Sequence, residues 1–228
     1  MLSDVMEDYL KAVYALEREH GPPVKTSAIA DYLDVTPPTV TSMVEKLEER
    51  GLLAREKYKG VELTPEGETV ALEVLRHHRL LEAFLADHLD YSFDEVHDEA
   101  DALEHHISEE FERRLARKLD DPTVDPHGDP IPGADLEPPE HPETAALADH
   151  EAGDRVVVAQ VDDRNSEELR YLRDAGIEPG TELAVREHAP IGLFVVDVDG
   201  DDVHLPDRVA AAIRVRAVDA PAGEVTRP

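Results

Sequence analysis

The sequence predicts an α+β protein in which helices come first and strands come last. Apolar residues recur at helical steps through about residue 119, whereas residues 153–218 alternate apolar and polar side chains as half-buried strands do. The clearest runs are residues 156–161, 182–185, 193–198 and 212–215. Between them, residues 120–150 are rich in Pro, Gly, Asp, Glu and His, with too many prolines for a long element. We therefore expect several small domains within the 228 residues, the last of them a small β-barrel.

Three helices open the chain. Helical periodicity covers residues 4–19 and ends at Gly21, residues 25–33 form a short second helix, and residues 34–36 form a turn. The third helix covers residues 37–50, because Thr36 is a favourable cap, Pro37 suits the first helical position and Gly51 ends the helix. This order is typical of a helix-turn-helix.

Two strand-like runs, residues 52–58 and 61–63, follow around Lys59 and Gly60 and predict a hairpin. The hairpin carries the basic residues Arg55, Lys57 and Lys59. A helix-turn-helix followed by a basic wing predicts a winged helix-turn-helix that binds double-stranded DNA. Units of three helices also serve as protein-binding modules, and that alternative stays open.

Two longer helices are expected next. The first is capped by the segment Thr64–Gly67 and is periodic over about residues 70–89, and the second covers about residues 92–119. The second has an apolar stripe wide enough for a helical partner and could pair with its copy in a dimer. The stripe is formed by Val96, Ala100, Leu103, Ile107, Phe111 and Leu115. A short helix near residues 166–175 interrupts the strand-rich segment that follows.

The chain is strongly acidic, with 53 Asp and Glu against 23 Lys and Arg and a formal net charge of −30. Residues 1–72 carry 8 basic and 14 acidic residues and the remainder carry 15 and 39, so the negative charge lies mainly outside the DNA-reading region. We expect a halophilic protein, because at molar salt the Debye length is about 3 Å and self-repulsion is screened. An acidic interaction protein at ordinary salt is the alternative.

Carboxylates and imidazoles gather over the two longer helices. Residues three and four apart share a helical face, so Asp101, Glu104 and His105 lie together. The chain has no cysteine, so a metal would be bound through oxygen and nitrogen, which favours hard or borderline divalent ions. A solvated charged face is the alternative. The full set is His78, Glu82, His97, Asp101, Glu104 and His105.

Catalytic use of such a metal would need an open coordination position, a general base and a substrate pocket. The sequence contains no His-Glu-x-x-His, no phosphate-binding glycine loop and no nucleophile elbow. We therefore do not expect an enzyme. The first residues contain no basic leader, and no apolar run approaches a membrane span, so we expect a cytoplasmic protein without a membrane partner.

At these residues the chain resembles the diphtheria toxin repressor family of metal-dependent transcriptional repressors, which includes iron-dependent and manganese transport regulators. The resemblance covers about residues 4–133 well and residues 150–218 loosely, and the latter look like an SH3-like (FeoA-type) third domain marked by Gly176–Gly180. The segments that carry it are Glu7–Tyr14, Thr36–Thr41, His78–Glu82, Val96–His105 and Asp129–Gly133.

The resemblance implies a repressor that is activated by Mn²⁺ or Fe²⁺, binds operator DNA as a homodimer and controls metal-uptake and homeostasis genes. It implies a primary metal site of Asp8, Asp101, Glu104 and His105. It also implies an ancillary site of His78, Glu82, His97 and Glu168, with Asn165 as an alternative to Glu168. The residues expected to face DNA are Thr36, Pro38, Thr39, Ser42, Arg55, Lys57 and Lys59.

The sequence predicts four segments. A winged helix-turn-helix domain covers residues 1–72, a helical metal-binding and dimerisation domain 73–133, an acidic Pro-rich linker 134–150, and an SH3-like FeoA-type domain 151–220.

The chain departs from both branches of the family that it resembles. The iron branch has Met and Cys where this chain has Asp8 and Asp101, so hard carboxylates replace soft ligands, as in the manganese branch. The manganese branch has Glu at the position of Lys11 and lacks an equivalent of His97. The expected site is thus a hybrid. A metal-independent winged-helix adaptor or a metal-buffering protein remains the alternative function.

Overall fold

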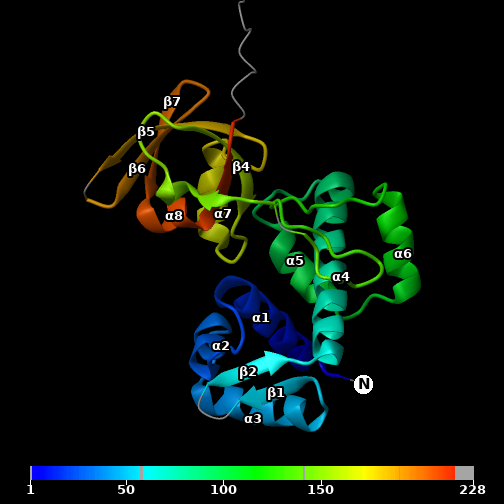
Figure 1. Ribbon diagram of the computed structural model, residues 1–228. Coiled ribbons are helices and arrows are strands. Elements are labelled where there is room, and N and C mark those ends of the chain that lie inside the picture. Colours follow the sequence, from blue (N-terminus) through cyan, green and yellow to red (C-terminus); the bar gives the residue numbers. More distant parts are fainter. Residues whose placement is uncertain (1, 57–58, 141, 190, 219–228) are drawn as a thin grey trace, which may run out of the picture. The chain divides into compact units, whose positions relative to one another are not determined.

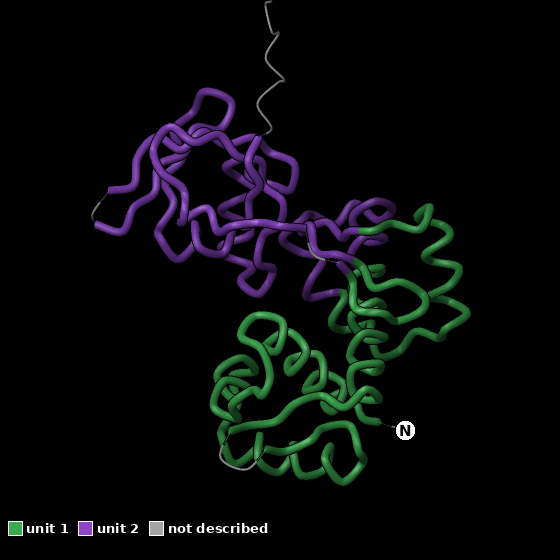
Figure 2. The backbone as a smooth tube through the Cα atoms, in the orientation of Figure 1, with its two compact units in different colours: residues 1–81, 100–123, 131–139 green, residues 82–99, 124–130, 140–228 purple. Residues whose placement is uncertain are grey.

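The computed structural model describes residues 2–56, 59–140, 142–189 and 191–218. They divide into two compact units (Figure 2): unit 1 contains residues 1–81, 100–123 and 131–139, and unit 2 contains residues 82–99, 124–130 and 140–228. The predicted α+β class is confirmed, with a winged helix-turn-helix first, helices next and a β domain last.

Unit 1 begins with α1 (Asp4–His20), α2 (Thr26–Tyr32) and α3 (Pro37–Glu49). The antiparallel hairpin of β1 (Leu53–Glu56) and β2 (Gly60–Leu63) follows (Figure 1). Lys57, predicted near the wing tip, lies outside the described residues. The core that joins these elements includes Leu10, Val13, Ile29, Val40, Val44, Leu47 and Val61, all of them fully buried.

Helix α4 (Pro65–Leu89) starts as predicted, since the Thr64 hydroxyl accepts a hydrogen bond from Gly67 N at 3.1 Å. The buried Arg76 is fixed by Glu112 Oε1 and by the carbonyl oxygen of Pro132, each at 2.6 Å. Residues 131–139 are thereby held to the helices of unit 1.

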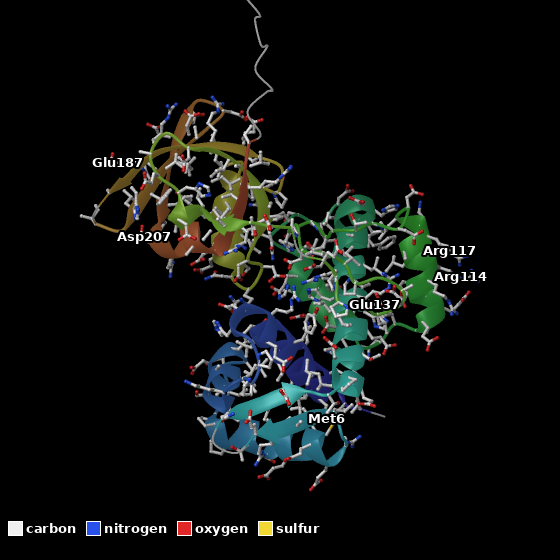
Figure 3. All side chains as sticks on the ribbon, viewed as in Figure 1. Met6, Arg114, Arg117, Glu137, Glu187 and Asp207 are labelled. Atoms are coloured by element: carbon white, nitrogen blue, oxygen red, sulfur yellow. The ribbon has the colours of Figure 1, made fainter. Side chains whose placement is uncertain are left out.

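The single helix predicted over residues 92–119 is wrong, because the structure has two helices, α5 (Val96–Leu103) and α6 (Glu109–Lys118). Ser108 begins α6, and its hydroxyl accepts a hydrogen bond from Phe111 N at 3.3 Å. Acidic residues fill the first turn of α6, which favours a helix start there. Arg114 and Arg117 project from the exposed side of α6 (Figure 3).

Unit 2 is built on an antiparallel sheet with the strand order β3-β8-β4-β5-β6-β7. The predicted strands correspond to β4 (Arg155–Val161), β5 (Glu182–Ala189), β6 (Leu193–Val198) and β8 (Ile213–Ala217), and the predicted helix to α7 (Ser166–Asp174). The elements not predicted are β3 (Ala145–Ala146), η1 (Leu147–Asp149), β7 (Asp201–Pro206) and α8 (Asp207–Ala212).

The core of unit 2 contains Leu147, Leu169, Ile177, Phe194 and Leu205, each fully buried. Leu147 thus lies in a core although it falls within the segment predicted as linker. Within the described part of the chain, no helix is both long and apolar enough to cross a membrane.

Candidate metal centre

Acidic, imidazole and ammonium groups from three parts of unit 1 meet around one buried carboxylate, Glu104, whose side chain is 1% exposed. We call this set the Glu104 cluster: Glu7, Asp8, Lys11, His78, Asp101, Glu104 and His105. Glu7, Asp8 and Lys11 lie on one face of α1, since they are three and four positions apart. Glu104 and His105 directly follow α5, at the break that the sequence did not predict.

His105 connects α1 to the end of α5. Its Nε2 lies 2.9 Å from Asp8 Oδ1 and 3.3 Å from Glu104 Oε1, and its Nδ1 lies 2.7 Å from Glu7 Oε2. Burial lowers the pKa of His105, but the carboxylates of Glu7, Glu104 and Asp8 outweigh that effect and raise it above its ordinary value. In contrast, burial raises the pKa of Asp8 despite the nearby His105 and Lys11.

Lys11 and His78 complete the cluster. Lys11 Nζ donates to Asp101 Oδ1 at 3.0 Å and to Glu104 Oε1 at 2.7 Å. Burial lowers the pKa of Lys11, but Glu104 and Asp101 raise it by more. His78 Nδ1 lies 2.6 Å from Glu104 Oε2 and 3.2 Å from Asp101 Oδ1, so His78, predicted for the ancillary site, contacts residues predicted for the primary one.

The donor atoms of the Glu104 cluster suit a divalent cation. One group, Asp8, Glu104 and His105, offers ligand atoms that all lie within 4.8 Å of one another. A second group with the same property, His78, Asp101 and Glu104, shares the buried carboxylate. Carboxylate oxygen and imidazole nitrogen without thiolate fit Mn²⁺ and Fe²⁺.

A second set of possible ligands lies within unit 2, and we call it the Glu82 cluster: Glu82, His97, Asp125, His127 and Asp163. His97 Nδ1 lies 3.4 Å from Glu82 Oε1 and 3.3 Å from Asp163 Oδ2. His127 is fully buried, and its Nδ1 lies 3.5 Å from Glu82 Oε1. Glu82, Asp125 and His127 are all buried, and their ligand atoms lie within 4.8 Å of one another.

Glu168, predicted as the ligand from the third domain, lies on α7 with its Oε1 3.1 Å from Arg208 Nη2. Asn165 caps α7, since its Oδ1 accepts hydrogen bonds from Glu167 N at 3.1 Å and Glu168 N at 3.2 Å. Asp163, which the sequence did not predict as a ligand, has its carboxylate in contact with His97.

The described residues that are predicted to face DNA all lie in unit 1, around the start of α3 and in the hairpin of β1 and β2. Thr36, Pro38, Thr39 and Ser42 are exposed at the start of α3. Thr36 begins α3, but its hydroxyl pairs with that of Thr39 at 2.8 Å instead of capping the helix backbone. Beside α3, a hollow of about 400 Å³ is lined by residues that include Lys25, Arg55 and Lys59.

Arg55 and Lys59 of the wing have acidic neighbours in their own unit. Arg55 lies 3.8 Å from Glu45 and 3.5 Å from Glu48, and Lys59 is paired with Glu56. DNA phosphates would therefore compete with carboxylates for these cations.

Family models match nearly the whole chain. The N-terminal DNA-binding domain of iron-dependent repressors matches residues 1–61, their metal-binding and dimerisation domain matches residues 64–133, and the FeoA domain matches residues 145–217. The diphtheria toxin repressor of Corynebacterium glutamicum is 37% identical over 96% of this chain and 98% of its own length. The chain belongs to the diphtheria toxin repressor family. The iron-dependent repressor IdeR of Mycobacterium tuberculosis is similar, with 36% identity over 95% of this chain and 99% of its own length.

Solved structures of the diphtheria toxin repressor family have the same fold as this chain. A manganese-dependent transcriptional repressor in complex with manganese is 37% identical, covers 93% of this chain and 100% of its own, and has a TM-score of 0.85. The repressor ScaR with bound Zn²⁺ is 34% identical, covers 93% and 99%, and has a TM-score of 0.80. Family membership makes this chain a DNA-binding, metal-dependent regulator and not an enzyme.

The residues missed from the sequence were Asp163, Asp125, His127 and Glu7. Asp125 and His127 lie in the Pro-rich segment that the sequence predicts as a loop, where no helical spacing relates them to Glu82. Glu7 was within reach of the helical rule, since it lies four positions before Lys11 on α1.

Proposed function

We propose that this chain represses transcription when Mn²⁺ or Fe²⁺ binds at the Glu104 cluster. The observation that carries the proposal is the connection from α1, in the DNA-reading domain, to the end of α5 through Asp8 and His105, whose atoms lie 2.9 Å apart. Asp8, Asp101, Glu104 and His105 would hold the ion. When bound, the ion supplies positive charge that these donors share.

A second ion would be held by the Glu82 cluster. Glu82 and His97 are the predicted ancillary ligands in unit 2, and the contact between His97 and Asp163 at 3.3 Å favours Asp163 over Glu168 as their partner. All these donors are carboxylates or imidazoles, which again favours a hard or borderline ion.

The proposed regulation acts on the geometry of a homodimer. A two-fold dimer must present its α3 helices to successive major grooves, about 34 Å apart. Metal binding favours that arrangement only if the metal binds it more tightly than other arrangements. Asp8 supplies this difference in metal affinity, because it reaches the ion only when α1 is in place. In this proposal residues 1–72 read DNA, residues 73–133 bind metal and dimerise, residues 134–150 link, and residues 151–220 form the FeoA-type domain. Repression of metal-uptake genes would place the protein in the cytoplasm.

The test is DNA binding with and without metal. A duplex selected from a random pool in the presence of Mn²⁺ would be titrated with the full chain in Mn²⁺ and in chelator. We expect tighter binding in Mn²⁺ by about 5- to 150-fold, the usual range of allosteric coupling. Asp8→Ala should abolish the difference, whereas Asp4→Ala, an exposed acid on the same helix, should keep it.

The outcomes separate the proposal from its alternatives. Equal affinity in Mn²⁺ and in chelator would favour a metal-independent adaptor. Mn²⁺ binding without recovery of any duplex would favour a metal-buffering protein. A parent-like metal response in Asp8→Ala would contradict the role of the Glu104 cluster.

A further inference from the structure

The Glu104 cluster contains a cation of its own, the ammonium group of Lys11. Its Nζ donates to Asp101 Oδ1 at 3.0 Å and to Glu104 Oε1 and Oε2 at 2.7 and 2.9 Å. An ammonium has three donors, so these three acceptor oxygens match its capacity. The Lys11 side chain is 21% exposed and that of Glu104 1%, so the pair lies largely out of water.

The oxygens that Lys11 contacts are also the oxygens that a metal would need. Within the Glu104 cluster, Glu104 belongs to both groups of ligand atoms that could hold an ion, and Asp101 belongs to one of these two groups. An ion at these oxygens would stand close to the ammonium, and like charges in a partly buried site repel strongly. The ion and the Lys11 ammonium therefore cannot both have full use of Glu104.

We propose that Lys11 is an internal counter-ion that competes with the activating metal for Glu104 and Asp101, and so sets the metal concentration at which the protein responds. The inference rests on the proposed function. In the metal-free protein, Lys11 compensates a carboxylate that would otherwise be buried as an uncompensated charge. Lys11 lies three positions after Asp8, so α1 provides both a metal ligand and its competitor.

A purely structural ion pair would behave differently. If Lys11 only held the ligands in place, its removal would weaken both the metal-free fold and metal binding. If Lys11 competes, its removal weakens the metal-free fold but tightens metal binding. The opposite signs of the two effects identify a competitor.

The experiment is a calorimetric titration of Mn²⁺ into the full chain, in a His97→Ala background so that the Glu82 cluster contributes little heat. We expect Lys11→Leu to bind Mn²⁺ on the order of tenfold more tightly, because one close like charge is removed. Its melting temperature in chelator should be lower than that of the parent. Lys11→Arg should keep the weaker, parent-like affinity.

Lys118→Leu is the matched control, since it removes the same charge from an exposed position on α6. It should change Mn²⁺ affinity little, which separates local competition from net charge. Asp8→Ala in the same titration tests the proposed function itself. If Asp8→Ala loses the site while Lys11→Leu binds no more tightly, the competitor role is overturned and the proposed function stands. If Asp8→Ala binds like the parent, the proposed function fails.

A measurement on the unmodified protein covers the case in which Lys11→Leu does not fold. Amine acylation followed by mass spectrometry reports how accessible each lysine is. We expect Mn²⁺ to increase labelling of Lys11, because the displaced ammonium moves toward solvent, and to leave Lys118 unchanged. Equal or lower labelling of Lys11 in Mn²⁺ would contradict competition.

Discussion

His127 is a fully buried imidazole among three carboxylates of unit 2. Burial lowers its pKa, but Glu82, Asp163 and Asp125 outweigh that effect and raise it to about 9. Its Nε2 donates to the carbonyl oxygen of Phe93 at 2.8 Å, so the ring is also fixed in orientation. Because the folded-state pKa lies above the ordinary value of about 6.5, protonated His127 stabilises the fold below about pH 6.5. That contribution is lost as the pH rises through about 9.

We therefore expect the metal-free protein to lose up to about 3 kcal/mol of unfolding free energy between pH 6.5 and pH 9. Urea unfolding in chelator at several pH values would measure the loss. His127→Asn should flatten this pH dependence, whereas His20→Asn, an exposed histidine at the end of α1, should leave it in place. A parent whose stability rises over this range would contradict a protonated His127.

Asp163 and Glu168 are alternative partners for His97, and a pair of substitutions decides between them. Asp163 contacts His97 at 3.3 Å, whereas Glu168 contacts Arg208 at 3.1 Å. We expect Asp163→Ala to weaken Mn²⁺ binding at the Glu82 cluster by about 10- to 100-fold, the usual cost of removing a supporting group at a metal site. Glu168→Ala should change it little. Calorimetry in an Asp8→Ala background isolates this site, and the reverse order of effects would restore Glu168 as the ligand.

At the scale of elements, helix positions were predictable wherever a local signal marked an end. Thr64 caps the start of α4 and Gly51 follows the end of α3, as the sequence predicts. Both signals are local, because capping and left-handed glycine conformations are properties of adjacent residues. The break between α5 and α6 was missed because the apolar stripe continues in phase across it. Phe111, which was assigned to that stripe, is 46% exposed. Strand β7 was missed because its two leading Asp residues hide the alternation.

The residues of the candidate site were predictable where sequence spacing relates them, just as helix ends were predictable where adjacent residues mark them. Asp101, Glu104 and His105 are three and four positions apart, so the sequence predicts them together, although Glu104 and His105 lie just beyond the end of α5. Residues that reach a cluster from a distant segment carry no such signal. Asp163 and His127 are examples, since they meet Glu82 and His97 only through the fold of unit 2. Family resemblance supplied Asp8, which spacing alone did not.

The loop 124–130 positions His127 against β4, and Gly128 makes that possible. The His127 carbonyl accepts a hydrogen bond from Val161 N at 2.9 Å, and Asp125 Oδ1 accepts from His127 N at 2.9 Å. Gly128 has a φ of +88°, and a Cβ there would lie 2.1 Å from the carbonyl oxygen of Ala159. No side chain fits this position without moving the loop from the strand.

Gly128→Ala should therefore lower the unfolding free energy by about 2 to 4 kcal/mol, since overpacking adds to the cost of a positive φ. Gly153→Ala is the matched control, because Gly153 has a φ of +102° but nothing within 4 Å of its Cβ position. It should cost only about 1 kcal/mol. Urea unfolding of both variants measures the difference. Equal decreases in unfolding free energy would show that the loop moves from β4 without further destabilising the fold.

At the scale of the whole molecule, the net charge of −30 determines how salt acts on DNA binding. Ordinary DNA-binding proteins release counterions from DNA, so their affinity falls steeply with salt. Here Arg55 and Lys59 are paired with acids of their own unit, and the acidic surface must take up cations as it approaches phosphate.

We expect a flattened or reversed salt dependence of DNA binding, measured by fluorescence anisotropy in saturating Mn²⁺ between about 0.2 and 2 M KCl. Replacing Glu45 and Glu48 with Gln should make the slope more negative, because fewer cations are then taken up. A steep negative slope in the parent would contradict the halophilic interpretation of this composition.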